Sequence, residues 1–325
     1  MNPAHGTLLC EAPVSSQADM DLAIHAAEEA FQDWRNTPPV ARARYLHRLI
    51  ALMEENFNEL SITQTLEHGK TIDESRGETR RGIEMLEVAS GIPSLMQGFN
   101  LEDIAHGIDE VAFYQPMGMF GCIAPFNFPL MVPLWFLPFA IACGNTFVVK
   151  SSPRTPMSQA AFFKLLDEVG LPPGVASLVN GETEGAKLKL DGRRLNLVGD
   201  LPEACFLNPT VLESVQPDMT CAMEEIFGPV ACVLRAKNLE EAIDIIHRNP
   251  YGNAASIFTN TGKWARQFRH EVVAGNVGIN VGIAAPMSFF PFGGRKDSFF
   301  GVVHGQGRDV IRFFTEPKIV IERWF

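Results

Sequence analysis

The segment from Met119 to Lys150 limits most tightly what this chain can fold into. Two short apolar runs rich in β-forming residues, 119–124 (MFGCIA) and 145–150 (NTFVVK), flank a longer apolar stretch at 128–143 (FPLMVPLWFLPFAIAC). That stretch is shorter than the ~20 residues that a membrane-spanning helix needs, and prolines interrupt it. We therefore predict one buried helix between two strands, which is a βαβ unit and requires a parallel sheet.

Helical patterns precede this unit. Ser16 with Asp19 three residues later matches a capping box, and apolar residues follow at helical spacing as far as Trp34. A second amphipathic helix is expected around 46–53 and a third over about 71–89. The first half of the chain therefore predicts helices packed against a parallel sheet.

Helix and strand patterns continue to alternate after the unit. A helix at 157–169 and a strand at 175–179 extend the first α/β region. Further elements are expected in the order strand, helix, strand, helix, strand at 230–234, 239–248, 255–258, 264–271 and 277–281. This alternation predicts a second, smaller α/β unit. The tail at 318–324 (KIVIERW) alternates apolar and polar residues and can form an edge strand that pairs with another subunit.

Charge and composition exclude several classes of function. The chain has a net charge of -11 and a pI near 5.2, so it lacks the basic face that nucleic acids or anionic membranes would require. Hydrophobic residues make up 46% and charged residues 20%, which are the proportions of a globular protein. His270-Glu271 lacks the second histidine of a zinc-binding HExxH motif, so no metal site is expected.

Cysteine usage and the N-terminus indicate a reducing compartment. The six cysteines show no CxxC spacing and are too sparse for a disulfide scaffold, so free thiols are expected. Residues 1–13 have neither the basic start and apolar core of a secretory signal nor an Arg-rich amphipathic pattern. We expect a cytoplasmic protein, with a mitochondrial matrix as the alternative in a eukaryote.

Asn127 lies in the run IAPFNFP (123–129), where the first strand of the unit ends and the buried helix begins. An amide N–H held rigidly at this position can stabilise an oxyanion. An asparagine at such a junction can equally cap the helix. The run alone leaves both interpretations open.

The run EEIFGPV (224–230) places Glu225 two residues before Phe227 and just ahead of a tight Gly228-Pro229 turn. A carboxylate in this setting can hold a ribose diol, and an aromatic ring can support a nicotinamide. The alternative is an exposed acidic pair beside one core phenylalanine. Taken by itself, this run favours the second interpretation.

Together the two runs resemble the aldehyde dehydrogenase superfamily. Other segments agree with that family in the same order, namely TFVVK (146–150), NPYGNAASIFT (249–259) and PFGGRKDS (291–298). Further stretches are similar to the CoA-acylating methylmalonate/malonate-semialdehyde dehydrogenases, namely LEHGKT (66–71), RRGIEMLEVASGIP (80–93), MVPLWFLPFAIACGNTF (131–147) and GINVGIAAPMSFFPFGG (278–294). The resemblance covers essentially the whole chain.

The resemblance implies a partial aldehyde dehydrogenase fold of the α/β class, with a truncated Rossmann-like parallel sheet and a truncated second α/β domain. It divides the chain into a partial NAD-binding domain at 1–183, a partial catalytic domain at 184–314 and an oligomerisation-type strand at 315–325. It also implies NAD as cofactor, CoA as co-substrate and a small semialdehyde as substrate. The implied assembly is a homo-oligomer or a hetero-oligomer with full-length relatives.

The resemblance also assigns roles to single residues. Asn127 matches the oxyanion-hole asparagine, and Lys150 matches a lysine that reaches the adenosine ribose of NAD. Glu225 and Phe227 match the contacts to the nicotinamide ribose and ring. Arg81 aligns with an arginine that binds the distal carboxylate of the substrate, a role that suits the guanidinium fork. The alternative for Arg81 is a solvated arginine on a helix face.

The family's nucleophilic cysteine has no counterpart in this sequence. After 178–181 (LVNG) the chain passes almost directly to 184–187 (EGAK), which matches a point well beyond the loop that carries that cysteine. The missing part also includes the Gly-Ser turn and the helix N-terminus that hold the pyrophosphate. None of the six cysteines is a good replacement, because a thiolate nucleophile needs a partly exposed, electropositive setting.

A second departure follows Lys150, where Ser151-Ser152-Pro153 replaces the usual Pro-Ser-Glu and removes an acidic contact to the ribose. We therefore expect the dehydrogenase activity to be lost or severely impaired. One alternative is a non-catalytic remnant, or a subunit that pairs with intact relatives. Another is an incomplete gene product whose fold is unstable.

Overall fold

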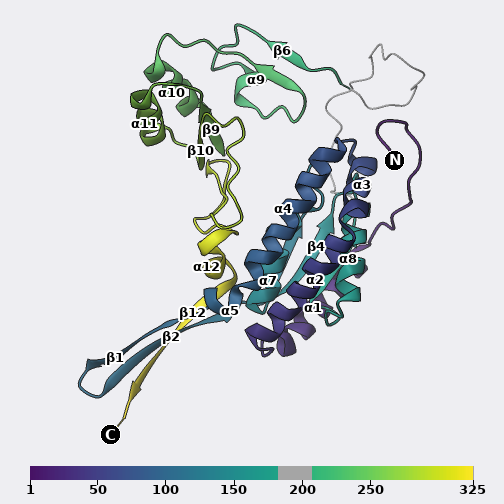
Figure 1. The fold of residues 1–325 in the computed structure, drawn as a ribbon, viewed down its shortest axis with the longest axis vertical. Coiled ribbons are helices and arrows are strands. Elements are labelled where there is room, and N and C mark those ends of the chain that lie inside the picture. The colour runs from purple at the N-terminus through teal and green to yellow at the C-terminus, as the bar shows by residue number, and fades with distance from the viewer. Residues whose placement is uncertain (182–206, 325) are drawn as a thin grey trace.

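The computed structural model describes residues 1–181 and 207–324. Its largest part is a body of long helices around a small sheet, from which a second lobe and a three-stranded sheet extend (Figure 1). The sequence junction that follows Gly181, and also Cys205, fall outside the described residues.

The three helices predicted before the βαβ unit are confirmed as α1 (Gln17–Trp34), α2 (Pro39–Glu55) and α4 (Ile72–Ser90). At the start of α1, the Ser16 side chain accepts a hydrogen bond from the Asp19 N–H, and the Asp19 carboxylate accepts one from the Ser16 N–H at 2.7 Å. Thr71 and Glu74 form the same reciprocal capping box at the start of α4. Each box satisfies amides that a helix start leaves unpaired.

One long helix was missed. α3 spans Phe57–His68 and ends at Gly69, whose φ of 87° is the left-handed conformation that suits glycine. The residues that α3 buries are Leu60, Ser61, Gln64 and Glu67, of which only the first is apolar. Because polar side chains face inward, the helix has no apolar periodicity from which it could be predicted.

The predicted βαβ unit is confirmed. β3 (Met119–Ile123), β4 (Thr146–Ser151) and β5 (Ala176–Asn180) form a parallel sheet in the order β3-β4-β5, and α8 (Met157–Glu168) connects the last two. α1 covers one face of this sheet, where Ala27 packs with Val148 and Val179. Phe147 and Val149 point from β4 into the main core on the opposite face.

The single buried helix predicted at 128–143 is wrong in one respect, because the structure contains two short helices. These are α6 (Met131–Leu134) and α7 (Leu137–Cys143), and every residue of α7 is buried. Pro138 has no N–H to donate to the carbonyl of Leu134, so a continuous helix would lose a hydrogen bond there and suffer a ring clash. Pro138 instead lies in the first turn of α7, where its missing N–H costs nothing.

A three-stranded antiparallel sheet projects away from the body (Figure 1). It contains β1 (Phe99–Ala105), β2 (Ile108–Pro116) and β12 (Thr315–Arg323) in the order β1-β2-β12. The strand predicted at 318–324 is therefore confirmed, and along its length it pairs with β2 of the same chain. β1 and β2 were not predicted; all residues of β1 are exposed, so no alternating burial pattern marks it. Pairing of β12 with another subunit stays a prediction.

The second lobe confirms the later alternation of strands and helices. β9 (Ala254–Ile257) and β10 (Asn276–Ile279) form a parallel pair. α10 (Leu239–Arg248) and α11 (Gly262–Glu271) pack on this pair through Ile243, Phe268 and Val272. A second parallel pair is formed by β6 (Thr210–Leu212) and β7 (Val230–Cys232). The short remaining elements are α5 (Ile92–Leu95), α9 (Thr220–Met223), β8 (Tyr251–Gly252), β11 (Arg295–Lys296), the 3-10 turn η1 (Gly307–Asp309) and α12 (Val310–Phe314).

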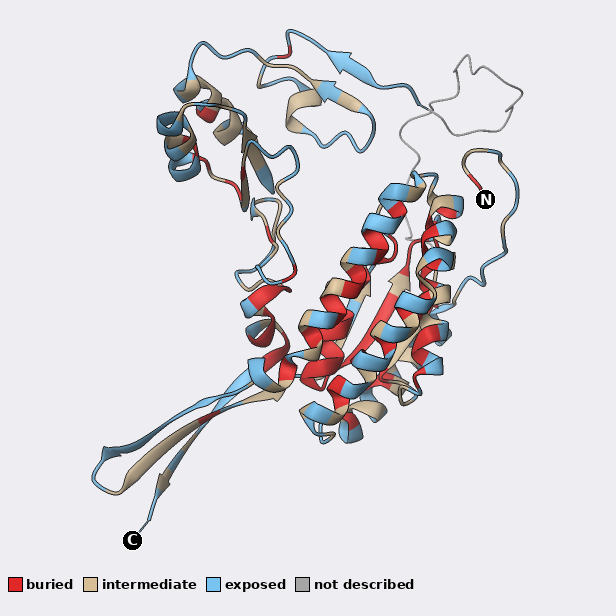
Figure 2. Ribbon diagram, in the orientation of Figure 1, coloured by how far each residue is buried: buried red, intermediate tan, exposed pale blue. Residues whose placement is uncertain are grey.

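Burial is uneven across these parts. Buried residues gather inside the helical body, whereas the second lobe and the projecting sheet are mostly exposed or half-buried (Figure 2). The second lobe has a core of only a few apolar side chains. Within residues 1–181 and 207–324, no helix is both long enough and apolar enough to cross a membrane.

Candidate functional site

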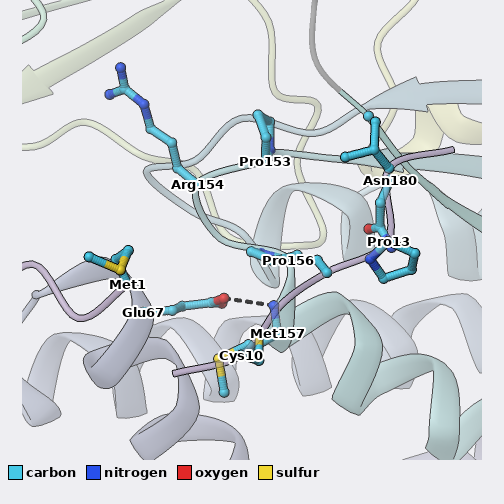
Figure 3. A pocket seen from close by; sticks show the side chains of 12 residues that line it. Met1, Cys10, Pro13, Glu67, Pro153, Arg154, Pro156, Met157 and Asn180 are labelled. Carbon is cyan, nitrogen blue, oxygen red and sulfur yellow. Dashed lines mark hydrogen bonds between the residues drawn. The ribbon is translucent and has the colours of Figure 1, made fainter. Parts of the chain in front are cut away.

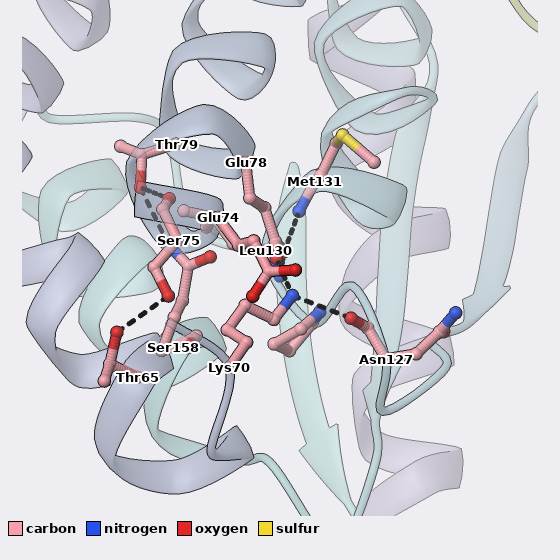
Figure 4. A network of polar contacts seen from close by, with 12 residues as sticks. Thr65, Lys70, Glu74, Ser75, Glu78, Thr79, Asn127, Leu130, Met131 and Ser158 are labelled. Atoms are coloured by element: carbon pink, nitrogen blue, oxygen red, sulfur yellow. Dashed lines mark hydrogen bonds and ion pairs between the residues drawn. The ribbon is translucent and has the colours of Figure 1, made fainter. Parts of the chain in front are cut away.

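Asn127 lies in the turn between β3 and α6, and two charged residues of the helical body hold that turn (Figure 4). Lys70 Nζ donates a hydrogen bond to the Asn127 backbone carbonyl at 2.8 Å and forms an ion pair with Glu78. The Glu78 Oε1 accepts hydrogen bonds from the backbone N–H groups of Leu130 and Met131, both at 3.0 Å. The turn is thereby held at Asn127 and again three to four residues later.

These contacts bear on what the Asn127 side chain is for. Glu78, and not Asn127, binds the first amides of α6, so the capping interpretation of Asn127 does not hold. In the part of the chain that the structure describes, the Asn127 side-chain amide has no hydrogen-bond partner. An unpaired amide on a fixed backbone is what an oxyanion donor requires.

The Lys70–Glu78 pair is almost completely buried, with side-chain exposures of 7% and 0%. Buried charges are costly unless each is paired and hydrogen-bonded. Both conditions are met, because Glu78 binds two amides and Lys70 binds a carbonyl and also lies 4.5 Å from the Phe128 ring centroid. This pair could not be predicted, since a lysine and a glutamate eight residues apart in the sequence form no distinctive pattern.

Aromatic contacts bring the two diagnostic runs together. The ring of Phe227 meets the ring of Phe126 edge-on, with the centroids 5.5 Å apart. His68 stacks on Phe126 at 6.1 Å, and the Arg154 guanidinium lies 5.0 Å from the same ring. Burial lowers the pKa of His68 to about 4, with a further contribution from Lys70, so the imidazole is neutral at pH 7. Phe126 is thus the hub between the Asn127 turn and the Glu225–Phe227 segment.

Glu225 is exposed and lines a large open cavity of about 910 Å³. Aromatic residues also line this cavity and include Trp135 and Phe292, whose ring centroids are 4.7 Å apart. Glu225 thus lines this cavity, whereas Phe227, two residues later, packs against Phe126. Trp135 and Phe292 were not singled out from the sequence.

Lys150 lies near the carboxyl end of β4, in register with Ile123 of β3 and Val179 of β5. Partial burial lowers its pKa below the ordinary lysine value. A smaller cavity of about 200 Å³ opens at this end of the sheet, lined among others by Glu67, Arg154 and Asn180 (Figure 3).

Glu67 is the carboxylate that lines that smaller cavity, and its role is structural. Its carboxylate accepts a hydrogen bond from the backbone N–H of Met157 at 2.7 Å (Figure 3). It accepts another from the backbone N–H of Ser158 at 2.9 Å, and so caps the start of α8. Burial raises the pKa of Glu67, and the hydrogen bonds from Ser158 and Met157 offset part of that rise.

Arg81 lies on α4 less than one turn beyond Glu78, but it reaches a different segment. Its guanidinium donates to the Pro286 carbonyl at 2.6 Å and contacts the Met287 sulfur at 2.7 Å, and Glu84 lies 3.4 Å away. The side chain is 24% exposed. The structure thus joins Arg81 to the 286–287 segment, while Asn127 and Phe227 meet around Phe126.

The described cysteines resemble no activated nucleophile. Burial raises the pKa of Cys143 to about 12 and that of Cys122 to about 11, so both stay protonated at neutral pH. The pKa of Cys232 is also raised, and its thiol donates to the Cys221 carbonyl at 3.3 Å. Cys10 is exposed, in the segment before α1.

Comparison with known proteins places these features in a family context. The model of the aldehyde dehydrogenase family matches residues 1–184 and 180–320. Malonate-semialdehyde dehydrogenase 3 of Geobacillus kaustophilus (strain HTA426) is 34% identical over 458 aligned positions, which cover 99% of this chain and 94% of that protein. Because the alignment is longer than the 325 residues of the chain, a large part of it is a gap here. The two family matches meet at 180–184, which places the gap directly after β5.

Solved structures show the same relationship. The crystal structure of methylmalonate-semialdehyde dehydrogenase from Oceanimonas doudoroffii superposes with a TM-score of 0.93 at 30% identity, covering 100% of this chain and 94% of that one. A protein from Sinorhizobium meliloti 1021 with a provisional description as the same enzyme, solved in complex with NAD, gives 0.92 at 29% identity and the same coverage. The described elements therefore keep their places although an internal segment is missing.

Proposed function

This chain belongs to the aldehyde dehydrogenase family, and from that premise we propose that it is a shortened CoA-acylating semialdehyde dehydrogenase that does not complete the family's reaction. Relatives named malonate- and methylmalonate-semialdehyde dehydrogenases support the substrate class. The observation that carries the proposal is the gap at 180–184, because the family's nucleophilic cysteine belongs to the part that is missing.

In the reaction that the family implies, a cysteine thiolate attacks the aldehyde carbonyl and an amide stabilises the resulting oxyanion. The turn around Asn127 supplies that amide on a backbone fixed by Lys70 and Glu78. Cys122 and Cys143 do not supply this thiolate, because burial raises the pKa of both thiols and keeps them protonated. A preorganised oxyanion donor alone cannot replace the covalent step.

The residues present fit the two ends of NAD better than its middle. Lys150 would contact the adenosine ribose, and Glu225 and Phe227 would contact the nicotinamide ribose and ring. Phe227 is 59% exposed, which leaves a ring face open to a ligand. The turn and helix N-terminus that would hold the pyrophosphate belong to the missing segment. When bound, NAD would supply the hydride acceptor; we expect it to bind weakly.

An NADH-formation assay with malonate semialdehyde, CoA and NAD tests the loss of activity. We expect no turnover above background, with a full-length relative assayed in parallel as the positive control. Turnover comparable to that relative would disprove the proposal and require a nucleophile other than the buried thiols. A separate titration with NAD, repeated with Phe227→Ala, shows whether the nicotinamide end still binds.

A second candidate function, that of an interaction subunit, is favoured by the projecting sheet. β12 is bonded to β2 along one edge and lies at the outside of its sheet, with Ile319 and Ile321 54% and 66% exposed. Such an edge can extend into the sheet of a second protein. Co-purification with a full-length relative, and its loss in Ile321→Lys, would support this function; failure of the two chains to associate would contradict it.

A further inference from the structure

β3 is an edge strand whose outer side is open. Among the described strands it is bonded to β4 alone, while its faces pack against α1 and, through Phe120, against Phe314 of α12. At the opposite edge of the same sheet the last residue of β5 is paired, because Ser15 donates its N–H to the Asn180 carbonyl at 2.6 Å and its side-chain oxygen accepts a hydrogen bond from the Asn180 N–H at 3.1 Å. The β5 edge is therefore partly hydrogen-bonded to another segment, whereas the β3 edge is open.

The backbone groups on the open side can be identified from the register. The Gly118 carbonyl accepts from Thr146, and the Ala124 N–H donates to the Lys150 carbonyl, so the even-numbered residues of this strand face β4. Because backbone groups alternate in direction along a strand, the odd-numbered residues Met119, Gly121 and Ile123 face outward. Within the described part of the chain, their N–H and C=O groups have no partner.

The open edge follows from the missing segment. In a doubly wound sheet the first three strands lie in the order 3-2-1, and the fourth lies beside the first. β3 is the first strand here, and the relatives' additional sequence begins directly after β5, the third. Among residues 1–181 and 207–324, no strand takes the place beside β3 that the fourth strand of a complete sheet would occupy.

The edge also lacks the usual protection against pairing. Natural edge strands carry charged residues, prolines or bulges that prevent association. The sequence of β3 is MFGCI, which has none of these charges or prolines, and its register with β4 is regular. Ile123 is 74% exposed, and Gly121 is exposed too.

We propose that two copies of this chain associate by pairing their β3 strands edge to edge, antiparallel, about a two-fold axis at Gly121. This arrangement uses all of the outward-facing residues, because Gly121 faces its own copy and Met119 faces Ile123 of the partner subunit. In an antiparallel sheet, residues so placed exchange both backbone hydrogen bonds. The result is one continuous sheet through both copies, a closed isologous dimer that leaves neither β3 edge open.

The axis position allows a charge-swap experiment. A Cβ atom built on Gly121 has no neighbour within 4 Å, so a side chain there is tolerated in the single chain. In the dimer, the two side chains at position 121 lie directly opposite each other, where like charges repel. We expect Gly121→Glu and Gly121→Lys each to raise the dimer dissociation constant at least about tenfold, and their equimolar mixture to restore it.

Sedimentation velocity over a concentration series measures the dimer dissociation constant of each protein. Thermal melts confirm that each variant is folded. Val302→Lys, at a position that is 85% exposed and lies outside both edge strands, is the matched control and is expected to leave the dissociation constant unchanged. The inference is overturned if wild type stays monomeric at the highest concentration, if the mixture dissociates as readily as either variant, or if Val302→Lys abolishes association. These outcomes do not depend on whether the chain has dehydrogenase activity.

Discussion

Lys70 donates a hydrogen bond to the backbone carbonyl of Asn127 at 2.8 Å, across 57 residues of sequence. Its partner Glu78 binds the amides of Leu130 and Met131 just beyond the same turn. The geometry of this turn is therefore set by the helical body, which this chain retains. The position of Asn127 requires no contact with the missing segment.

Breaking the buried pair on one side should strongly destabilise the protein. Lys70→Met leaves the fully buried Glu78 carboxylate without a counter-charge, and we expect a loss of ~3–5 kcal/mol in the free energy of unfolding. The double variant Lys70→Met/Glu78→Gln should recover part of this loss, because glutamine remains an acceptor for the α6 amides without a charge. Urea denaturation of wild type, Lys70→Met, Glu78→Gln and the double variant measures the coupling energy between the two side chains. Strictly additive losses would contradict it.

Glu67 should make the protein more stable as the pH falls. Burial raises its pKa in the folded state above the ordinary 4.5, so the folded protein binds this proton more tightly than the unfolded chain does. Stability relative to Glu67→Gln should therefore rise as the pH is lowered through the raised pKa toward 4.5. The melting temperature of wild type minus that of Glu67→Gln, measured from pH 7 downward, should become more positive. A constant difference would contradict this expectation.

His68 should make the protein less stable as the pH falls. Its pKa is lowered to about 4 by burial and by Lys70, so the unfolded chain binds this proton more tightly than the folded protein does. Its contribution to stability is present above pH 6.5 and is lost as the pH falls from 6.5 toward 4. His68→Phe keeps a ring against Phe126 and should remove this dependence. An unchanged acid profile in that variant would show that another group is responsible.

Lys296 should stabilise the second lobe through the end of α10. Its Nζ donates to the carbonyls of Ile246, His247 and Asn249, at 3.2, 3.0 and 2.8 Å, where a helix leaves carbonyls unpaired. We expect Lys296→Met to cost ~1–2 kcal/mol and to speed amide exchange in α10. Lys263→Met, an exposed lysine near the start of α11, is the control and should change little. Equal effects of both variants would rule out the helix-end contacts as the cause.

The parts of the fold that could be predicted are those that bury apolar side chains in a regular pattern. The apolar runs around 119–150 mark β3, β4 and the helices between them, and the reciprocal pairs Ser16–Asp19 and Thr71–Glu74 mark two helix starts. α3 escaped because it buries Ser61, Gln64 and Glu67. β1 escaped because both of its faces are exposed.

In the candidate site, too, the features that could be predicted are those with a local sequence pattern. Family resemblance identified Asn127 and Phe227, but their shared contact with Phe126 follows from the fold and from no local pattern. Glu78 could be read only as one polar residue of an amphipathic helix, because its burial depends on the amides of α6 that meet it. Roles that rest on distant backbone groups leave no signature in a single sequence.

The pairing of β2 with β12 brings residues 116 and 315 together and so closes the chain between them into one long loop. The segment that this chain lacks lies within that loop, so the two ends of the loop stay paired without it. The entropy of closing a flexible loop changes by only about 0.6 kcal/mol for each doubling of its length. A loop closed in this way can therefore gain or lose a large segment with little change in the free energy of closing it. This makes this stretch of the family's sequence a natural place for evolutionary deletion.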